Sequence, residues 1–590
     1  MFRPNVQHLQ VPMFSTVDSL PAKVLKRLES SWVGTFYHQV FVRIDESIFA
    51  VLYSNEPSRP NIPINVLVGL ETLKSGFGWT DEEMYDHFCF DVQVRYALGY
   101  RDLSDGYFAL RTMYNFRDRV TQHMKETGEN LIDKAFEQVT DEQIAAFALQ
   151  TGKLRMDSTQ IGSNIRAMSR LQLLVEVLQR VQRMLQEDDQ ERYGDLFAPY
   201  IRGTSGQYTY HIKASEVDEH LQRIGELMDE LIGELCAAYA EEETYQLLQR
   251  VFQEHFTCEP DSDEPSSPPD DLSKQTALRP KAGKELSASS LQSPDDAQAT
   301  YREKGRKGYI GYVANLTETC EPENDFQLIV KVQTESNNTD DAAMLAQALP
   351  ELVERTDVDQ MNTDGGYNSP DVDDMMREHH VEQIQTAIRG RKPSSDKLGL
   401  DDFEWQIDTD GRPEAVTCPH GQHADVTPGR KADRFRAAVQ RATCETCPLV
   451  GKCPTLPLKR TPERVLRFSQ HEVDLALRRQ RSTQAHASGQ NLRAAVEATV
   501  RSIKHPFGNG KVSVRGKPRV SIVIVASALM SNLRRIHQHL MHQRRPKKGQ
   551  GALADQFSST DQQSALSFLS RLQVILRSVF PFRSAWAGQF

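Results

Sequence analysis

The stretch KLRMDSTQI at residues 153–161 decides the fold class of this 590-residue chain. Its apolar Leu154 and Met156 alternate with polar neighbours, which is the pattern of a β-strand with one buried face. Asp157 would lie at or near the end of that strand. We therefore expect a sheet to begin here, with a carboxylate at its edge.

Further strands are predicted downstream, with a helix at 340–352 between the second and the third: 309–316 (YIGYVANL), 326–334 (FQLIVKVQT), 360–363 and 384–388. Strands interleaved with helices indicate an α/β sheet. Asp364 follows the third of these strands in TDGGYNSP, where a Gly-Gly turn would leave the carboxylate exposed. An Asp before Gly is most often a turn residue that bonds its own backbone, so spacing alone favours a structural role.

Helical segments flank and interrupt this sheet. Residues 1–145 show apolar residues at helical spacing and form a predicted all-helical N-terminal domain. Residues 165–257 form a predicted helical insertion, which packs on itself or on a partner. Its apolar residues step by four and three, as in a helical seam: Val217, Leu221, Ile224, Met228, Leu231 and Leu235. Residues 258–299 are rich in Ser, Pro and Asp and predict a solvated linker.

The other predicted domain boundaries follow from the positions of these helical segments. The sheet domain is predicted from 150–164 and 300–390, and it is completed by 471–545. Residues 391–470 form a cysteine-containing insertion, and 546–590 form a tail. In the last part of the domain we expect a helix from about 473 to 503, broken or loosened around Gly489.

The net charge of −11 at first argues against a nucleic-acid partner, because binding phosphates requires clustered cations. The charge is unevenly spread, however. Residues 451–550 hold 21 Lys and Arg against 4 Asp and Glu, a net charge of +17, whereas residues 211–300 carry a net charge of −13. Basic clusters at 511–519 (KVSVRGKPR) and 544–548 (RRPKK) would supply phosphate contacts, although the second also suits a disordered tail.

Four of the eight cysteines form the late pattern C-x25-C-x2-C-x5-C: Cys418, Cys444, Cys447 and Cys453. They supply the four soft ligands of a structural Zn²⁺ site, with His420 and His423 as substitutes. The spacing is not a standard zinc pattern, so thiols without metal are an equal alternative. The longest mostly apolar run, 520–530, is too short to cross a bilayer and predicts a buried strand or helix. With no apolar segment of a secretory signal at its start, the chain is expected in the cytoplasm and away from membranes.

Glu497 adds a third acid in a predicted helix. Arg493 lies four residues before it and Lys504 seven after it, so the three share one helical face. Alone, this pattern indicates no more than an ordinary surface ion pair.

Together these motifs resemble the catalytic core of DDE-type transposases of bacterial insertion sequences. The resemblance rests on four segments: MDSTQI (156–161), ATYREKGRKGYIGYVANL (299–316), TDGGYNSP (363–370) and RAAVEATVRSIK (493–504). The segments LVGLETLKSGFGWTDEEMYDHFCFDVQVRYALG (67–99) and LRTMYNFRDRV (110–120) are similar to the N-terminal domain of the same family. The resemblance leaves out 165–299 and the residues past 550.

The resemblance implies an RNase H-like mixed sheet with flanking helices, in which Asp157, Asp364 and Glu497 are the catalytic acids. They would hold Mg²⁺, for which Mn²⁺ can substitute, because two such ions about 3.5–4 Å apart can activate a water and stabilise the leaving 3′-oxygen. The family's last motif places a Tyr where this chain has Gln490, so whatever that ring supplies is missing here.

The same resemblance implies DNA partners, namely the terminal inverted repeats of the element and the target DNA. The expected DNA-contacting side chains are Arg493, Lys504, Arg501, Lys511 and Arg515. The N-terminal helices would recognise the element ends, and a homo-oligomer would assemble on DNA, with the heptad-like insertion as a candidate assembly surface. The expected location is the bacterial cytoplasm at the nucleoid.

Two other functions compete with this hypothesis. One is a catalytically inactive, repurposed transposase that only binds DNA, which the intact set of three acids disfavours. The other is a coiled-coil scaffold, which only residues 165–256 favour and which the predicted strands around Asp157 and Asp364 oppose.

Overall fold

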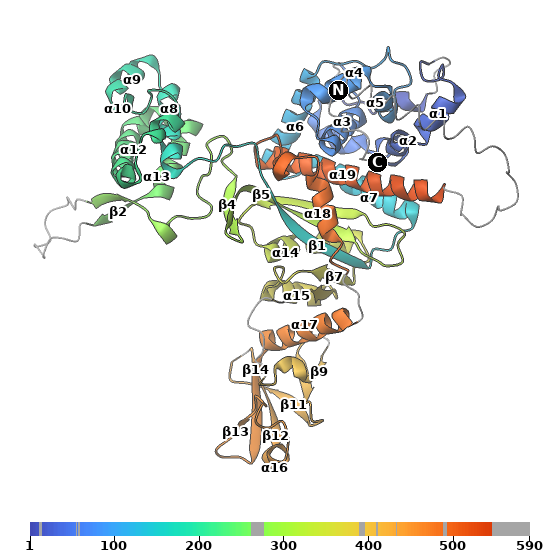
Figure 1. The fold of residues 1–590 in the computed structure, drawn as a ribbon, viewed down its shortest axis with the longest axis vertical. Helices are drawn as coiled ribbons and strands as arrows, with labels where there is room; N and C mark the ends of the chain where they lie inside the picture. The colour runs from blue at the N-terminus through green and yellow to red at the C-terminus, as the bar shows by residue number, and fades with distance from the viewer. Residues whose placement is uncertain are drawn as a thin grey trace, which may run out of the picture.

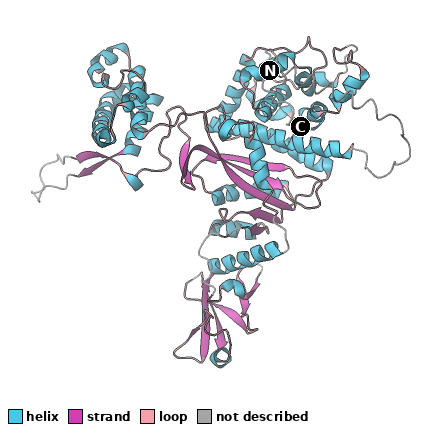
Figure 2. Ribbon diagram, viewed as in Figure 1, coloured by secondary structure: helices cyan, strands magenta, loops and turns pink. Residues whose placement is uncertain are grey.

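Three arms extend from a central sheet in the computed structural model of this chain (Figure 1). The structure describes residues 1–544 except 11–14, 55, 57, 58, 261–275, 387, 389–395, 409, 410, 432 and 488–491. Helices build the two upper arms, whereas strands dominate the centre and the lower arm (Figure 2). The expectation of a mixed α/β chain is confirmed. The predicted tail, Gln490 and most of the RRPKK cluster lie outside the described residues.

The central sheet is mixed. Its strands are β1 (Lys153–Ile161), β4 (Thr300–Lys304), β5 (Lys307–Thr319), β6 (Ile329–Ser336), β7 (Gln360–Thr363) and β8 (Glu382–Gln385). The order is β6-β5-β1-β7-β8, and β4 pairs with the first residues of β5 beside β6. The β6-β5-β1 pairings are antiparallel, and β7 and β8 run parallel to β1. The segment KLRMDSTQI is therefore the middle strand of the sheet.

Helices cover both faces of this sheet. Leu154 and Met156 point to one face, where they pack with residues of α14 (Asp341–Arg355) and α15 (Pro370–Glu378). The other face carries α18 (Val496–Lys504) and α19 (Lys517–Gln543). Because successive side chains of a strand alternate between faces, Arg155 and Asp157 point toward α18.

The N-terminal helices share one hydrophobic core with the C-terminal helix α19. They are α1 (Ala22–Glu29), α2 (Trp32–Gln39), α3 (Ile64–Phe77), α4 (Asp81–Phe90), α5 (Val92–Ala97), α6 (Arg111–Thr127) and α7 (Leu131–Phe147). The apolar run 520–530 lies in α19 and is buried along its whole length. Gly76 of α3 lets the two helices approach closely, since a Cβ there would lie only 2.1 Å from Met530 Cγ. The N-terminal helices and the sheet are thus packed together through α19.

The helical insertion has a core of its own. It consists of α8 (Arg170–Met184), α9 (Glu187–Arg192), α10 (Gly194–Phe197), α11 (Ser205–Tyr210), α12 (Val217–Tyr239) and α13 (Glu243–His255). The apolar seam of α12 is buried inside this unit, where α12 packs on α8 and α13. The seam is therefore filled within the chain and is not open to a second copy. Part of the expected linker is ordered, because β2 (Phe256–Pro260) pairs with β3 (Thr276–Pro280) and Leu291 joins the core.

The lower arm is a second sheet with strand order β13-β14-β12-β11-β10-β9. The strands are β9 (Glu404–Ile407), β10 (Pro413–Thr417), β11 (His423–Pro428), β12 (Arg434–Gln440), β13 (Leu456–Pro457) and β14 (Glu463–Ser469), with α16 (Arg441–Glu445) at the tip (Figure 1). α17 (Gln470–Ala487) leads back toward the central sheet and lies beside β8. The helix expected from about 473 to 503 with a break around Gly489 is present as two helices, α17 and α18, which lie on either side of that position. Gly489 itself lies outside the described residues.

Short 3-10 helices complete the secondary structure at Gln7–Leu9, Phe41–Arg43, Glu46–Leu52, Ala214–Glu216, Gly283–Glu285, Leu400–Asp402 and Gly508–Gly510. Within the described part of the chain, no helix combines the length and the apolar character needed to cross a membrane.

Candidate active site

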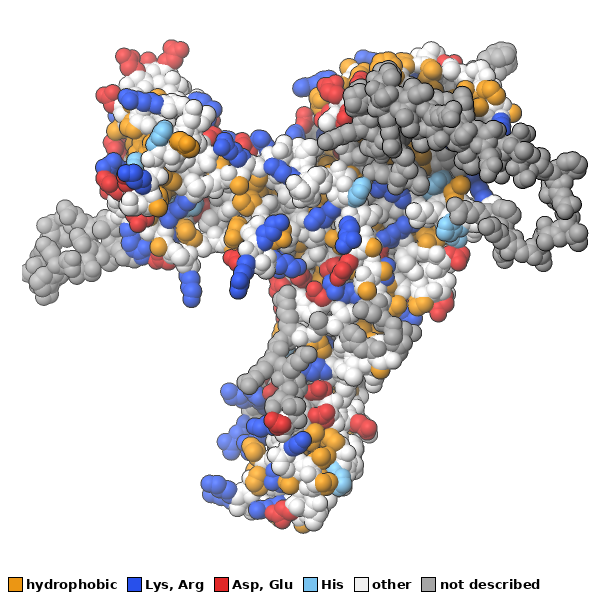
Figure 3. Space-filling model, in the orientation of Figure 1, with side chains coloured by type: hydrophobic (Ala, Val, Ile, Leu, Met, Phe, Trp, Pro, Cys, Tyr) orange, Lys and Arg blue, Asp and Glu red, His pale blue; other side chains and the backbone are white. Residues whose placement is uncertain are grey.

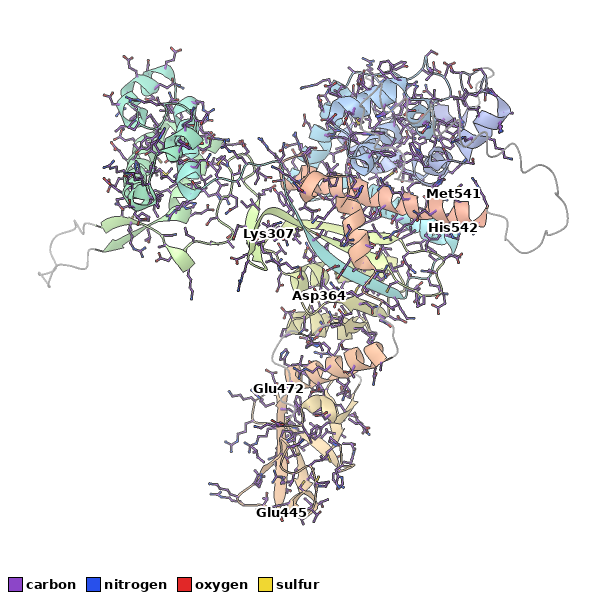
Figure 4. All side chains as sticks on the ribbon, in the orientation of Figure 1. Lys307, Asp364, Glu445, Glu472, Met541 and His542 are labelled. Carbon is purple, nitrogen blue, oxygen red and sulfur yellow. The ribbon has the colours of Figure 1, made fainter. Side chains whose placement is uncertain are left out.

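Asp157 and Asp364 lie side by side at the edge of the central sheet. β1 and β7 are parallel neighbours in which Arg155 is paired with Asn362, so two residues further along Asp157 stands opposite Asp364. Figure 4 shows Asp364 where the central sheet meets the lower arm. The sheet therefore brings together two acids that are 207 positions apart in the chain.

Arg493 bridges the two aspartates. Its Nη2 lies 3.2 Å from Asp157 Oδ1 and 3.7 Å from Asp364 Oδ2. The Asp157 side chain is only 14% exposed and that of Asp364 is 33% exposed. Burial raises the pKa of Asp157 above its ordinary value, the Arg493 guanidinium opposes that rise, and the charge of Asp364 adds to it. The gap between the two carboxylates thus already holds a positive charge.

Backbone N–H groups orient both carboxylates. The N–H of Ser158 donates to Asp157 Oδ1 (3.0 Å), and the N–H of Gly366 donates to Asp364 Oδ1 (2.7 Å). The second bond is the local turn contact that the Asp-Gly-Gly sequence predicts. It leaves Asp364 Oδ2 to face Arg493, so the turn role and a role in the site coexist in one side chain.

Glu497 is an exposed residue in the first turn of α18. Among the described residues, no three or more His, Cys, Asp or Glu side chains are arranged to hold a metal ion, so Glu497 does not complete such a group with the two aspartates in this structure. Arg493 precedes the helix, so the predicted shared helical face holds only for Glu497 and Lys504.

The α18 helix is nevertheless firmly attached beside the aspartates. Thr499 Oγ1 donates to Glu318 Oε2 (2.7 Å), and Lys504 Nζ donates to Thr159 Oγ1 of β1 (3.1 Å). Just before the helix, the carbonyl of Leu492 accepts from Arg155 Nη1 (2.7 Å). These contacts set the position of the segment that carries both Arg493 and Glu497.

Glu318 is a structural centre that the sequence analysis missed. It lies on β5 with no exposed surface, and it accepts from Arg155 Nε (2.7 Å) and Arg535 Nη1 (2.7 Å) as well as from Thr499. A buried carboxylate requires such partners, because losing water costs several kcal/mol per ion. The available signal was a single charged residue in the otherwise uncharged stretch YIGYVANLTET (309–319).

Asp341 is a further carboxylate near the site that the sequence analysis did not identify. This buried residue at the start of α14 accepts from Ser158 Oγ (2.8 Å), next to Asp157. The neighbouring Tyr367 is fully buried and donates to Asn315 Oδ1 (2.7 Å). Burial raises the pKa of Tyr367 well above its usual value, and the charges of Asp341, Asp157 and Asp364 add to that rise. An Asp at a helix start is ordinarily a cap, which is why the pattern carried no catalytic signal.

The other predicted DNA-contacting cations differ in exposure and in partners. Arg501 is exposed on α18. Burial and the nearby Lys307 lower the pKa of the half-buried Lys504. Lys511 Nζ donates to the carbonyl of Ile165 (2.8 Å), whereas Arg515 pairs with Asp295 (3.4 Å).

Lys and Arg side chains gather on the middle of the visible face in Figure 3, over the central sheet. Lys307 in Figure 4 is one of them. Arg493 contacts two acids at once, whereas Arg515 pairs with one.

The four clustered cysteines lie in the lower arm, around one small cavity near α16. None of the eight cysteines forms a disulfide. Of the two proposed substitutes, His423 is exposed and lies beside Asp425 (3.8 Å).

Comparison with known proteins identifies one family. Residues 417–537 match the family model described as "Transposase DDE domain". The match spans the chain from β10 through α18 to α19, and it includes the four cysteines, Arg493 and Glu497, while Asp157 and Asp364 precede it. No curated protein and no solved structure matches the chain significantly. Residues 417–537 therefore match a transposase DDE domain, and this match supports the resemblance to DDE-type transposases found in the sequence.

Proposed function

We propose that this protein cleaves DNA strands at the ends of its own mobile element and joins the freed 3′-hydroxyls to target DNA. The observation that carries the proposal is the juxtaposition of Asp157 and Asp364 across two parallel strands, with a cation between them. The sheet order β6-β5-β1-β7-β8, with two antiparallel pairings followed by two parallel ones, supports an RNase H-like core.

The donor chemistry suits a hard divalent cation. Mg²⁺ prefers oxygen ligands and takes one or two protein carboxylates while water and substrate phosphate complete its shell, and Mn²⁺ can replace it. Asp157 and Asp364 would hold the metal, with Glu497 as a third ligand once the first turn of α18 faces them. A metal bound there would supply stabilisation of the charge on the attacking and leaving oxygens.

The residues of the chain would perform the remaining tasks. The N–H groups of Ser158 and Gly366 hold one oxygen of each aspartate, which leaves the other oxygen of Asp364 directed into the site. Arg493, displaced from the aspartates, would be free to form a fork with a DNA phosphate. Lys504 would then place a point charge further along the same strand.

The partners in this proposal are the terminal inverted repeats and the target DNA. Arg501 and Lys511 are exposed and would contact phosphates, while the N-terminal helices would recognise the element ends. Assembly of more than one copy on DNA remains part of the proposal, but through surfaces other than the filled seam of α12. The proposed setting is the bacterial nucleoid.

The decisive experiment is cleavage of DNA bearing the element ends in the presence of Mg²⁺ or Mn²⁺. We expect Asp157→Asn, Asp364→Asn and Glu497→Gln each to reduce cutting by roughly 100-fold or more, because each removes a negative ligand from the reacting centre. Binding, measured by mobility shift, should stay nearly unchanged. Asp229→Asn, an exposed acid on α12, is the control and should cut normally.

Each outcome of this experiment discriminates between hypotheses. Cutting that survives one substitution refutes the assignment of that residue. A wild-type protein that binds the ends but does not cut with either metal favours the inactive, DNA-binding alternative.

A further inference from the structure

The tip of the lower arm is held by a small hydrophobic core. Its buried apolar residues are Phe403, Val416, Ala424, Ala437, Leu466, Phe468 and Val473. A core of this size contributes little stability, and small units of this kind often rely on disulfides or a metal. The cysteines of this arm form no disulfide, so disulfide bonds do not stabilise it.

The four clustered cysteines surround a single cavity of about 40 Å³. Cys418 follows β10, Cys444 lies in α16, Cys447 follows that helix, and Cys453 precedes β13. Apolar side chains from β10, β12 and β14 form the opposite wall, among them Val416, Val439 and Leu466. Cysteines from three separate segments therefore converge over one face of the sheet, although the first and last are 35 positions apart.

The backbone around the sulfurs forms tight turns that present them to the cavity. The N–H of Gln422 donates to Cys418 Sγ (3.3 Å), and the N–H of Gly421, a glycine with φ +77°, donates to the carbonyl of Cys418 (2.8 Å). The N–H of Cys447 donates to the carbonyl of Cys444 (3.2 Å) in a second turn. An N–H directed at a sulfur favours the thiolate form and fixes the orientation of the ligand.

A divalent ion that prefers sulfur would join the three segments whose cysteines line this cavity.

We propose that Cys418, Cys444, Cys447 and Cys453 bind one Zn²⁺ ion that holds the tip of the lower arm together. Four thiolates are a closed set of tetrahedral zinc ligands at about 2.3 Å, which leaves no open position for catalysis. In the described chain no three such side chains already stand in metal-binding positions, so binding draws the sulfurs inward over the cavity. This site is independent of the proposed cleavage chemistry.

The test is the metal content of the full-length protein purified without chelators, measured by mass spectrometry of the metal. We expect about one zinc per chain in the wild type, by the ligand count of a four-thiolate site. Cys444→Ser and Cys447→Ser should each lower it strongly. The matched control is Cys258→Ser, which changes an exposed cysteine of the helical insertion and should leave the zinc content unchanged.

A second measurement covers variants that fail to fold. Chelation of zinc from the wild-type protein should release the metal and make the four clustered thiols newly reactive toward a thiol reagent, while the exposed Cys258 reacts before and after. Three results would each overturn the proposal: wild-type protein without stoichiometric zinc, clustered thiols that are equally reactive before and after chelation, or iron bound in place of zinc.

Discussion

Arg493 has different contacts in the structure from those that its sequence motif predicts. The spacing of Arg493, Glu497 and Lys504 indicates a helical face turned toward DNA, yet Arg493 lies before the helix and contacts Asp157 and Asp364. Its guanidinium compensates two partly buried negative charges, which would otherwise repel each other. Arg493 therefore stabilises the close approach of the two aspartates.

Glu318 provides a prediction at the same scale. Glu318→Gln should lower the free energy of unfolding by about 3 kcal/mol, because it removes the buried charge that pairs with Arg155 and Arg535. Glu219→Gln in the exposed pair with Arg223 is the control and should change stability by less than about 0.5 kcal/mol. Urea unfolding of both variants measures the difference. Equal effects of the two substitutions would contradict the anchoring role of Glu318.

A cluster of ion pairs joins β6, α7 and α14. Lys331 of β6 contacts Glu137 of α7 and Glu351 of α14, the latter at 2.6 Å. Arg355 of α14 completes the cluster through Glu137 (3.2 Å) and Asp141 (2.8 Å). The packing of α7 and α14 on β6 therefore depends on how these acids are protonated.

This cluster predicts a pH dependence. Burial, the charge of Asp133 and a hydrogen bond with Glu351 raise the pKa of Glu137 to about 8. The pKa of Glu137 is therefore higher in the folded protein than in the unfolded chain, where it is about 4.3. The contribution of the protonated Glu137 to the free energy of unfolding is fully present below about pH 4.3 and is lost as the pH rises through about 8. Glu137→Gln mimics the protonated form, so between pH 6 and 9 the wild type should lose roughly 1–2 kcal/mol relative to it.

Denaturant unfolding of the wild type and of Glu137→Gln at pH 6 and pH 9 measures this difference. Glu142→Gln changes a more exposed acid on the same helix, paired with Arg43, and should follow the wild type at both values. A difference that does not change with pH would show that Glu137 is ionised throughout this range.

At the scale of the whole molecule, charge is segregated between the arms and the centre. Many cations of the basic stretch 451–550 lie in or next to α17, α18 and α19, whereas more than half of the acids of the stretch 211–300 lie in α12, α13 and the turns that flank them. A strongly negative arm attached to a basic centre would direct DNA toward the central sheet and away from the insertion.

This segregation predicts a steep salt dependence of DNA binding. The logarithm of the binding constant should fall linearly with the logarithm of salt concentration, and Arg501→Ala and Lys511→Ala should each reduce the slope by about 1. Lys213→Ala, an exposed lysine of the insertion, should leave the slope unchanged. Fluorescence anisotropy between low and moderate salt measures all three. A larger effect of Lys213 would place DNA on the insertion instead.

The sequence by itself determined the local elements of this protein. The alternation around Asp157, the strands that follow it and the seam of α12 were predicted correctly, because periodicity reports which side chains are buried. The short motifs also resembled the transposase family whose DDE-domain model matches residues 417–537.

Only the tertiary structure determined which of those elements contact one another. It joined Asp157 to Asp364 through strand register, placed Arg493 between them, and buried Glu318 beneath α18. It also packed α19 into the N-terminal helices. Such contacts join residues hundreds of positions apart. They leave no periodic trace in the sequence, because they depend on the order of strands in the sheet and on which helix covers each face.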